Sequence, residues 1–381
     1  MKFSVISLVM ITATASIAAD GSTALKGQLE WRQVVGNTSV VSGGFGNPDN
    51  IMIRHLEPQG GDLFAVTFNE QKGAEVWKSQ TGIDWTLVHQ GGIGTNTATM
   101  QDLVSFEGML YAASHPDSNC LWRSPTGTNW MSVDGPCSSP SSWNEGVLKL
   151  KVFGDHLYAG TSTFFVGCEI WRSSDGESWQ PIAVGGFGNA GNSTISELEV
   201  FGGQLYAATS GSGCELWRSP DGVAWTQVLE DCFPGYFRID AMEVFQNRFY
   251  AGAGFSGLPG FNLWSSSDGV HWTEGATEPS LLLQATDHHL FSATLVSPYQ
   301  VLVSSDGSDW APDNDSSFGN PNNYRYSGIG VFDGYLYVAA RNGTEGSELW
   351  RKFVGLFADG FETGDTSGWS VTMPLETSVN N

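Results

Sequence analysis

Three arginines, Arg54, Arg238 and Arg325, each lie at the start of a partly apolar segment that runs to a tight turn; the segments after Arg238 and Arg325 end at a phenylalanine, and the one after Arg54 ends at Gln59. A guanidinium group donates two parallel hydrogen bonds to a carboxylate, so arginines that meet in one place can hold an acidic ligand. The other polar and aromatic candidates at the starts of such segments are His55, Glu145, Glu197, Tyr236, Asp240, Tyr324 and Tyr326. We expect these residues to form one ligand-binding face.

The elements that position these residues belong to a repeat of about 45 residues, a period typical of propeller blades. Its most regular part is a pair of tryptophans eight residues apart with a polar turn between them, as in Trp217 to Trp225 (WRSPDGVAW). The same spacing occurs at residues 77–85, 122–130, 171–179 and 264–272, and at 302–310 with leucine in the first position.

Each unit also contains an apolar run ending in phenylalanine, a tight turn and a Leu-Tyr-Ala segment, as in residues 198–208. Four short strands per unit are therefore predicted. The last unit has a first tryptophan, Trp350, without its partner, whereas the chain begins with a lone partner segment at Trp31. We predict an all-β, seven-bladed β-propeller over residues 27–354, with four-stranded blades and a ring closed by the N-terminal strand, which leaves no exposed sheet edge.

The turn between the tryptophans has the pattern Ser-x-Asp-Gly-x-x-Trp, and its aspartates are Asp175, Asp221, Asp268 and Asp306. This pattern resembles the Asp-box, or bacterial neuraminidase repeat, of sialidases and other secreted propellers. It departs from that family by one fewer residue between Asp and Gly, and two units carry threonine instead of Asp. The resemblance implies that these aspartates stabilise turns. The chain is also similar to uncharacterised exported propeller proteins that share the Gly-Phe-Gly-Asn and Leu-Tyr-Ala phrases.

Residues 237–240, Phe-Arg-Ile-Asp, resemble the sialidase phrase Phe-Arg-Ile-Pro, but they lie in the middle of the chain and end in Asp. A sialidase also needs a tyrosine nucleophile with a glutamate partner and a separate acid. Tyr324 or Tyr326 with Glu145 or Glu197 would supply the residue types, and nothing in the sequence pairs them. The catalytic residues of such an enzyme stay unknown.

Five cysteines leave at least one without an intrachain partner. Two pairs flank tryptophan hairpins at separations that place both members on adjacent strands, namely Cys120 with Cys137 and Cys214 with Cys232. We predict two disulfides, each worth about 3 kcal/mol through loop closure. Cys168 is the expected free thiol, because Gly186 takes the position of its partner.

Metal and cofactor signals are weak. No histidine lies at a ligand spacing from the cysteines, so we expect no metal site there and no cofactor. Residues 313–315, Asp-Asn-Asp, are a weak candidate for a calcium loop, with a solvated turn as the alternative.

The net charge of −23 argues against binding to nucleic acid or an anionic membrane surface, since both require a basic face. Residues 1–18 have the basic start, short apolar run and small residues of a secretory signal peptide. We therefore expect a secreted monomer, extracellular or periplasmic, without a membrane span. Residues 355–381 lie beyond the repeat, and we expect a disordered tail.

The leading hypothesis is a binding protein without catalysis, whose ligand is an extracellular glycan. One alternative is a sialidase-like glycoside hydrolase or a polysaccharide lyase, and another is a scaffold that binds proteins. A further possibility is that the arginines only form salt bridges with Asp240, Asp102 or Glu197 inside a filled channel. Propellers support unrelated functions, so the fold does not decide among these hypotheses.

Overall fold

The computed structural model describes residues 30–94, 99–116, 119–138, 143–233, 236–254, 261–275, 280–294 and 297–355. The predicted signal peptide and residues 356–381 of the predicted tail lie outside the described residues. The described chain is almost entirely β-structure, with three short 3-10 helices, η1 (Gly43–Gly46), η2 (Gly185–Gly188) and η3 (Ser316–Gly319). Among the described residues, no helix has the length and apolar character to cross a bilayer.

Five sheets have four antiparallel strands each. They consist of β2 (Met52–Gln59), β3 (Asp62–Phe68), β4 (Val76–Ser79) and β5 (Thr86–His89); β6 (Thr99–Phe106), β7 (Met109–His115), β8 (Leu121–Ser124) and β9 (Met131–Ser132); β18 (Arg238–Phe245), β19 (Arg248–Gly254), β20 (Phe261–Ser266) and β21 (Thr273–Glu274); β22 (Ser280–Ala285), β23 (Leu290–Thr294), β24 (Val301–Ser304) and β25 (Ala311–Pro312); and β26 (Asn323–Phe332), β27 (Tyr335–Asn342), β28 (Glu348–Phe353) and β1 (Arg32–Val35).

The remaining strands form one eight-stranded sheet. They are β10 (Asn144–Phe153), β11 (His156–Thr163), β12 (Ile170–Ser173), β13 (Gln180–Ala183), β14 (Asn192–Phe201), β15 (Gln204–Gly211), β16 (Leu216–Ser219) and β17 (Thr226–Leu229). A single residue pair, Ser162 with Thr194, joins β11 to β14. The prediction of an all-β propeller is confirmed, and separate four-stranded blades account for five of the six sheets.

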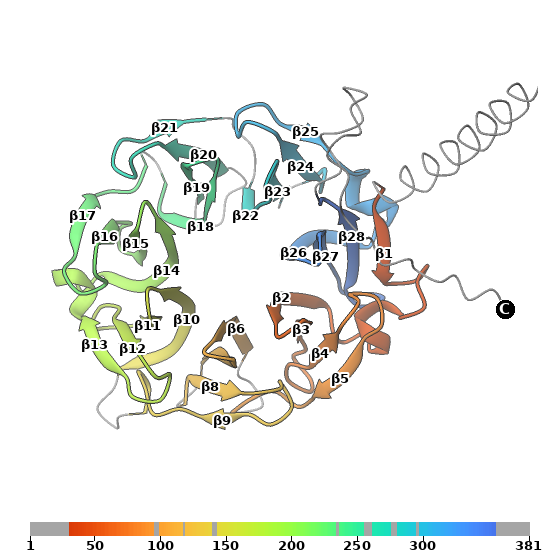
Figure 1. The fold of residues 1–381 in the computed structure, drawn as a ribbon, viewed down its shortest axis with the longest axis horizontal. Helices are drawn as coiled ribbons and strands as arrows, with labels where there is room; N and C mark the ends of the chain where they lie inside the picture. Colours follow the sequence, from red (N-terminus) through yellow and green to blue (C-terminus); the bar gives the residue numbers. More distant parts are fainter. Residues whose placement is uncertain are drawn as a thin grey trace, which may run out of the picture.

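The sheets are arranged around a common centre (Figure 1). Each of the strands β2, β6, β10, β14, β18 and β22 contacts the next member of this series, and β26 contacts both β22 and β2. We call these the inner strands. Each inner strand forms a hairpin with the strand that follows it, so its start lies beside the end of that neighbour.

The N-terminal strand completes the last sheet, as the sequence predicts. β1 pairs with β28, with Arg32 opposite Arg351 and Gln33 opposite Trp350. This strand therefore completes the sheet that begins with β26, and a C-terminal edge that would otherwise be open is paired.

The Gly-Phe-Gly-Asn sequence, which occurs at residues 44–47 and 186–189 and as Ser-Phe-Gly-Asn at 317–320, packs against the tryptophans of three units. Phe45 stacks on Trp77 with ring centroids 4.7 Å apart and meets Trp85 edge-on at 5.4 Å. Phe187 and Phe318 stack in the same way on the first tryptophan of their own units. Such stacked and edge-on pairs add to the free energy gained by burying the rings.

A buried glutamate two residues before the first tryptophan connects this packing to the loop. Glu348 accepts hydrogen bonds from the amides of Asn320 and Asn323, both at 2.7 Å, and from the indole of Trp350 at 3.0 Å. Equivalent asparagine-to-glutamate and indole-to-glutamate bonds occur at Glu75, Glu169 and Glu215. The sequence analysis missed these glutamates.

The turn aspartates lie at the outer ends of the blades, where they cap turn amides. Asp175 accepts the backbone N–H groups of Glu177 and Ser178 at 2.8 and 2.7 Å, and these bonds lower its pKa. Asp221, Asp268 and Asp306 make the same contacts.

The glycine after each aspartate packs against the preceding blade. A Cβ atom on Gly222 would lie 1.9 Å from the hydroxyl of Tyr158, and Gly222 has a φ of +71°. Tyr158 belongs to a Leu-Tyr-Ala segment of the neighbouring unit. The Asp-Gly turn of one unit and the Leu-Tyr-Ala strand of its neighbour therefore determine how consecutive units pack.

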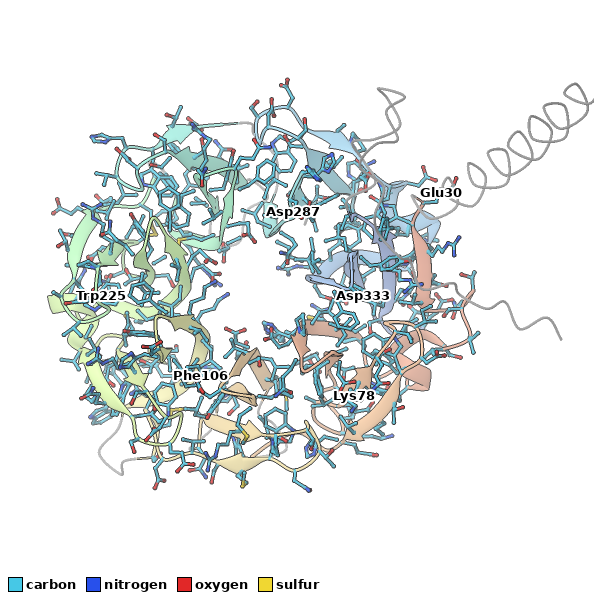
Figure 2. All side chains as sticks on the ribbon, viewed as in Figure 1. Glu30, Lys78, Phe106, Trp225, Asp287 and Asp333 are labelled. Atoms are coloured by element: carbon cyan, nitrogen blue, oxygen red, sulfur yellow. A yellow bond between two sulfur atoms is a disulfide. The ribbon has the colours of Figure 1, made fainter. Side chains whose placement is uncertain are left out.

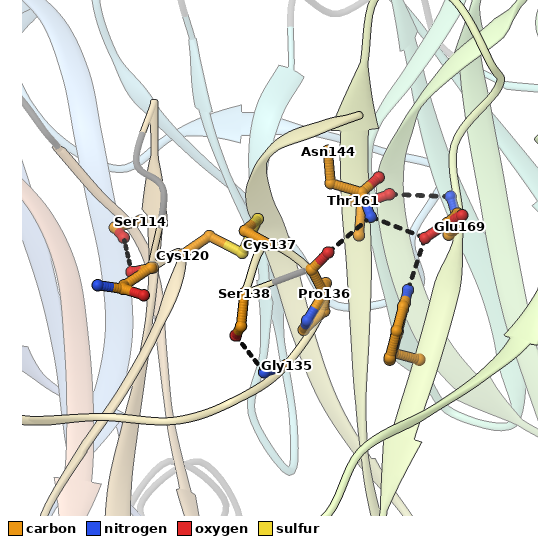
Figure 3. Close-up of a disulfide and its surroundings, with 11 residues drawn as sticks. Ser114, Cys120, Gly135, Pro136, Cys137, Ser138, Asn144, Thr161 and Glu169 are labelled. Carbon is orange, nitrogen blue, oxygen red and sulfur yellow. Dashed lines mark hydrogen bonds between the residues drawn. A yellow bond between two sulfur atoms is a disulfide. The ribbon is translucent and has the colours of Figure 1, made fainter. Parts of the chain in front are cut away.

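Both predicted disulfides are present. Cys120 joins Cys137 (Figure 3) and Cys214 joins Cys232, with Cα atoms 5.7 and 5.0 Å apart. Cys168 is a buried free thiol whose carbonyl accepts the N–H of Gly186, just as the Cys214 carbonyl accepts that of Cys232. The free thiol and its glycine counterpart were correctly predicted.

Candidate functional site

A recurring β-bulge shapes the start of the inner strands. In β2, β6, β14, β18 and β26 the pairing register shifts by one residue near the beginning of the strand. The residues left unpaired are Arg54, Gln101, Ser196, Asp240 and Ser327. A bulge redirects side chains away from strict alternation. The unpaired residue is polar in these five strands, whereas the corresponding shifts leave Leu148 unpaired in β10 and Leu281 in β22. Figure 2 shows side chains of the inner strands around the centre of the ring.

Three arginines gather on one side of the centre, and we call Arg54, Arg325 and Arg341 the arginine cluster. Arg325 pairs with Arg341 across the β26–β27 hairpin, and β2 contacts both strands. The pKa of Arg54 is lowered by burial and by the positive charges of Arg341 and Arg325. Arg325 and Arg341 therefore lie close enough to Arg54 to disfavour its positive charge.

The contacts of the arginine cluster are neutral. Arg54 donates to the side-chain carbonyl of Gln101 at 2.9 Å and lies 5.3 Å from the ring centre of Phe68. Arg341 lies 5.3 Å from the ring centre of Tyr324. Within the described part of the chain, no carboxylate forms an ion pair with any arginine of the cluster. The buried Nε atoms of Arg54 and Arg341 have no hydrogen-bond partner there either.

Two other pairs of charged residues lie near the centre. Arg238 lies 2.5 Å from Asp240, and Lys149 lies 2.7 Å from Glu197. Burial raises the pKa of Asp240, although Arg238, Lys149 and Arg325 oppose the rise. The salt bridge expected for Arg238 is therefore present, with Asp240 as its partner. Glu197 pairs with Lys149 and not with an arginine, and no ion pair of Arg54 or Arg325 occurs among the described residues.

His55 has both ring nitrogens engaged. Nδ1 lies 3.4 Å from Asp102, and Nε2 is hydrogen-bonded to the backbone carbonyl of Gln101. Burial lowers the pKa of His55, although Asp102 and the Gln101 carbonyl oppose the shift. Asp102 in turn accepts the N–H groups of Leu103 and Leu150 at 2.9 and 2.7 Å. These contacts fix the ring as a link between neighbouring strands.

The predicted tyrosines and Glu145 occupy different surroundings. Tyr324 is exposed beside Arg341, whereas Tyr326 is only 2% exposed and its hydroxyl donates to the Tyr299 carbonyl at 3.1 Å. The ring of Tyr326 therefore lies in the core, and Tyr324 is the exposed member of the pair. Tyr236 packs partly buried against another core cluster. Glu145 lies 3.9 Å from His115 and not in the arginine cluster.

Arg341 and Lys149 are the residues that sequence reasoning missed. Arg341 follows the Leu-Tyr-Val-Ala-Ala segment of the last unit and lies opposite Arg325. Regular pairing counted from the hairpin turn at Phe332 and Tyr335 would place Arg341 opposite Tyr326. The bulge at Ser327 shifts the register by one residue and places Arg341 opposite Arg325. Lys149 lies in the apolar run of its unit and carried no signal of its own.

The candidate calcium loop is tied to neighbouring strands. Asp313 accepts hydrogen bonds from Lys352 at 2.5 Å and from the indole of Trp31 at 3.0 Å. Asn314 donates to the hydroxyl of Tyr326 at 2.9 Å. No group of three or more metal-binding side chains occurs among the described residues. Calcium binding at this loop stays a prediction.

The chain matches no family model and no curated protein sequence. Solved structures share its fold. YCF48 bound to a D1 peptide has a TM-score of 0.57 and 17% identity over 82% of this chain and 94% of that one. The extracellular domain of the putative one-component system BT4673 from B. thetaiotaomicron has a TM-score of 0.53 and 12% identity, over 78% of this chain and 38% of that one.

An enzyme is also among the similar structures. A puromycin hydrolase mutant complexed with PGG has a TM-score of 0.53 and 9% identity, over 85% of this chain and 56% of that one. At these identities the likeness shows the β-propeller fold alone.

Proposed function

We propose that this chain is a secreted, seven-bladed β-propeller that binds an acidic extracellular glycan at its arginine cluster, without catalysis. The observation that carries the proposal is that Arg54, Arg325 and Arg341 lie together while no described carboxylate pairs with any of them. Neighbouring like charges raise the free energy of the unliganded protein, and an anion would remove that repulsion.

The blade number rests on the eight-stranded sheet. Only the pair Ser162–Thr194 joins β11 to β14, whereas β10–β13 and β14–β17 each have the internal pairing of a complete unit. Counting this sheet as two blades gives seven. The cycle of contacts among the inner strands supports that number.

A carboxylate suits the chemistry of the cluster. Arg325 is exposed, and Arg54 and Arg341 are partly buried with neutral neighbours. Guanidinium groups bind carboxylates through parallel hydrogen bonds, and partial burial strengthens such bonds. Tyr324 adds an exposed ring beside Arg341, which can pack against the apolar face of a sugar. A uronic or sialic acid unit would use both features.

Binding is favoured over hydrolysis by the state of the candidate catalytic groups. Tyr326 is buried and hydrogen-bonded to Tyr299, and both nitrogens of His55 are engaged. Asp240 and Glu197 are paired with Arg238 and Lys149. A glycoside hydrolase or lyase reaction would need at least one of these groups to change partners. Mass spectrometry of the reaction products tests this alternative.

A protein ligand is the second candidate. YCF48, which shares the fold, is solved with a bound peptide, and the C-terminal carboxylate or an acidic side chain of a peptide would meet the same arginines. Secretion itself is supported by the two disulfides, which persist in oxidising compartments, and by the signal-like residues 1–18.

The test is calorimetric titration of the exported protein with oligosaccharides that end in a uronic or sialic acid and with their neutral counterparts. We expect binding of acidic saccharides only, weakened about 30-fold by Arg325→Ala or Arg341→Ala, as for the loss of about 2 kcal/mol of charge-assisted hydrogen bonding. Arg248→Ala is the matched control, because Arg248 is an exposed arginine that contacts Ser265 at the hairpin end of its blade.

Other outcomes of these titrations would support a different function. Equal binding of neutral saccharides, or no effect of the cluster variants, would refute the arginine site. Binding of peptides with a free C-terminus, without saccharide binding, would favour the protein-ligand candidate. Mass spectrometry of the same mixtures would reveal cleavage products, and products that disappear with Arg325→Ala would show that the protein is an enzyme.

A further inference from the structure

One blade presents an apolar surface that neither the fold nor the arginine cluster uses. We define the apolar patch as Trp143, Phe164, Phe165, Val166 and Val184, whose side chains are 63, 71, 75, 37 and 56% exposed. The ring of Phe165 lies 6.4 Å from that of Trp143 and 6.1 Å from that of Phe164. Val184 precedes Gly185, which lies beside the Val166 carbonyl. The five residues thus form one surface.

The patch lies on the face where the inner strands begin. Trp143 immediately precedes β10 and Phe164 immediately follows β11, and the adjoining residues Asn144 and Thr163 are paired. The described chain ends near the opposite face, where the Val354 N–H binds the carbonyl of a hairpin glycine. The start of β1 pairs with the end of β28, so it lies on that opposite face as well. Both ends of the described chain therefore lie on the face opposite the patch.

The internal repeat shows that the loop does not need these aromatic residues. The hydroxyl of Thr163 accepts the backbone N–H groups two and three residues later, at 3.3 and 3.4 Å. Asn69 and Asn342 accept the equivalent N–H groups at 2.9 to 3.0 Å. The same turn therefore forms around three different sequences, which are Phe164–Val166, Glu70–Lys72 and Gly343–Glu345.

We propose that the apolar patch binds an apolar segment of another protein. Adjacent exposed tryptophan and phenylalanine side chains are typical of the residues that dominate protein–protein affinity, and exposed apolar surface of this kind marks interaction sites. A glycan would need several hydrogen-bonding groups, and the five side chains offer only the indole N–H of Trp143.

The charge of the chain disfavours the other occupants. An anionic membrane surface attracts basic residues, whereas this protein carries a net charge of −23. Two copies with that charge repel each other, which opposes self-association through the patch. A different protein, neutral or basic around its apolar segment, avoids both penalties.

The experiment selects random 12-residue peptides displayed on phage against the full exported protein. The matched control replaces the turn with that of the first blade, through Phe164→Glu, Phe165→Gln and Val166→Lys. We expect enriched peptides with aromatic or aliphatic residues, binding weakened at least tenfold by this exchange, and an unchanged thermal unfolding midpoint. Arg325→Ala should leave peptide binding unchanged, which separates this site from the arginine cluster.

Several outcomes would overturn the proposal. They are the absence of enriched apolar peptides, equal binding to the exchanged turn, binding of neutral phosphatidylcholine vesicles that requires the patch, and a dimer in sedimentation that the exchange abolishes. If the exchanged turn impairs folding, the single variant Phe165→Ser provides the same comparison with a smaller change.

Discussion

Replacing Glu348 by alanine should destabilise the fold by about 3 kcal/mol. Glu348 is 2% exposed, and its carboxylate accepts three hydrogen bonds, from Asn320, Asn323 and Trp350. Hydrogen bonds to a charged group contribute roughly 1.5–3 kcal/mol each. The substitution would leave the indole of Trp350 without an acceptor in the sheet that β1 completes.

The net loss is smaller than the sum of three such bonds. Asn320 keeps a bond to Glu345 at 3.0 Å, and Asn323 keeps a bond to the Ser317 carbonyl at 3.0 Å. Removing the carboxylate also removes the free-energy cost of burying its charge. Glu348→Gln retains the volume but directs an amide N–H toward one of the donors, so we expect it to cost about 1–2 kcal/mol.

The assay is urea unfolding followed by tryptophan fluorescence, with the midpoint as the measured quantity because a chain of this length need not unfold in two states. Glu230→Gln, at an exposed carboxylate, is the control and should stay within about 0.5 kcal/mol of wild type. A Glu348→Ala midpoint equal to that of the control would refute the role assigned to the buried glutamates.

Three further predictions follow from buried groups and tight turns. Burial raises the pKa of Glu57 and Glu243 from 4.5 to about 7. Between these two pH values the folded protein keeps a proton on each group that the unfolded chain has lost. The free energy of unfolding should therefore fall as the pH rises from 4.5 to 7, by up to about 3 kcal/mol per group. Urea midpoints at pH 5 and 8 test this, and Glu243→Gln should shrink the difference; a flat profile would contradict it. Gly222→Ala should lower the free energy of unfolding by about 2–4 kcal/mol, because its Cβ would collide with the hydroxyl of Tyr158. Gly202→Ala is the control: Gly202 also has a positive φ, +58°, but its Cβ would have no atom within 4 Å, so the loss should be only about 1 kcal/mol. Equal shifts of the thermal unfolding midpoint in the two variants would rule out the collision. Cys168, whose pKa burial raises to about 12, should resist iodoacetamide until the protein unfolds, and native-state alkylation seen by mass spectrometry would disprove its burial.

Most of the fold was predictable because the same sequence pattern recurs in several units of the chain. Two tryptophans eight residues apart with a glycine turn between them specify a hairpin, and Gly222 shows why that glycine is needed. The lone segment at Trp31 predicted the pairing of β1 with β28. The cysteine positions predicted both disulfides, because residues at matching places on adjacent strands lie within bonding distance.

The candidate site was predictable only in part. Its general place, at the start of the inner strands, followed from aligning the units, and Arg54 and Arg325 were identified correctly as neighbours. The burial of Tyr326 could not be predicted, because a β-bulge interrupts the two-residue alternation from which side-chain directions are read. The role of the buried glutamates was also missed, since their amide partners lie about 25 residues away along the chain.

The sequence by itself determined the strands, the turns, the pairing of β1 with β28 and the disulfides, all of which follow from positions within the repeat. Only the tertiary structure decided which charges pair and which do not. Arg238 meets Asp240 two residues away on its own strand, whereas Arg54, Arg325 and Arg341 are brought together from three strands, and no described carboxylate forms an ion pair with them. Ion pairing depends on distances of a few ångströms between different strands, and the register shifts at the bulges set those distances.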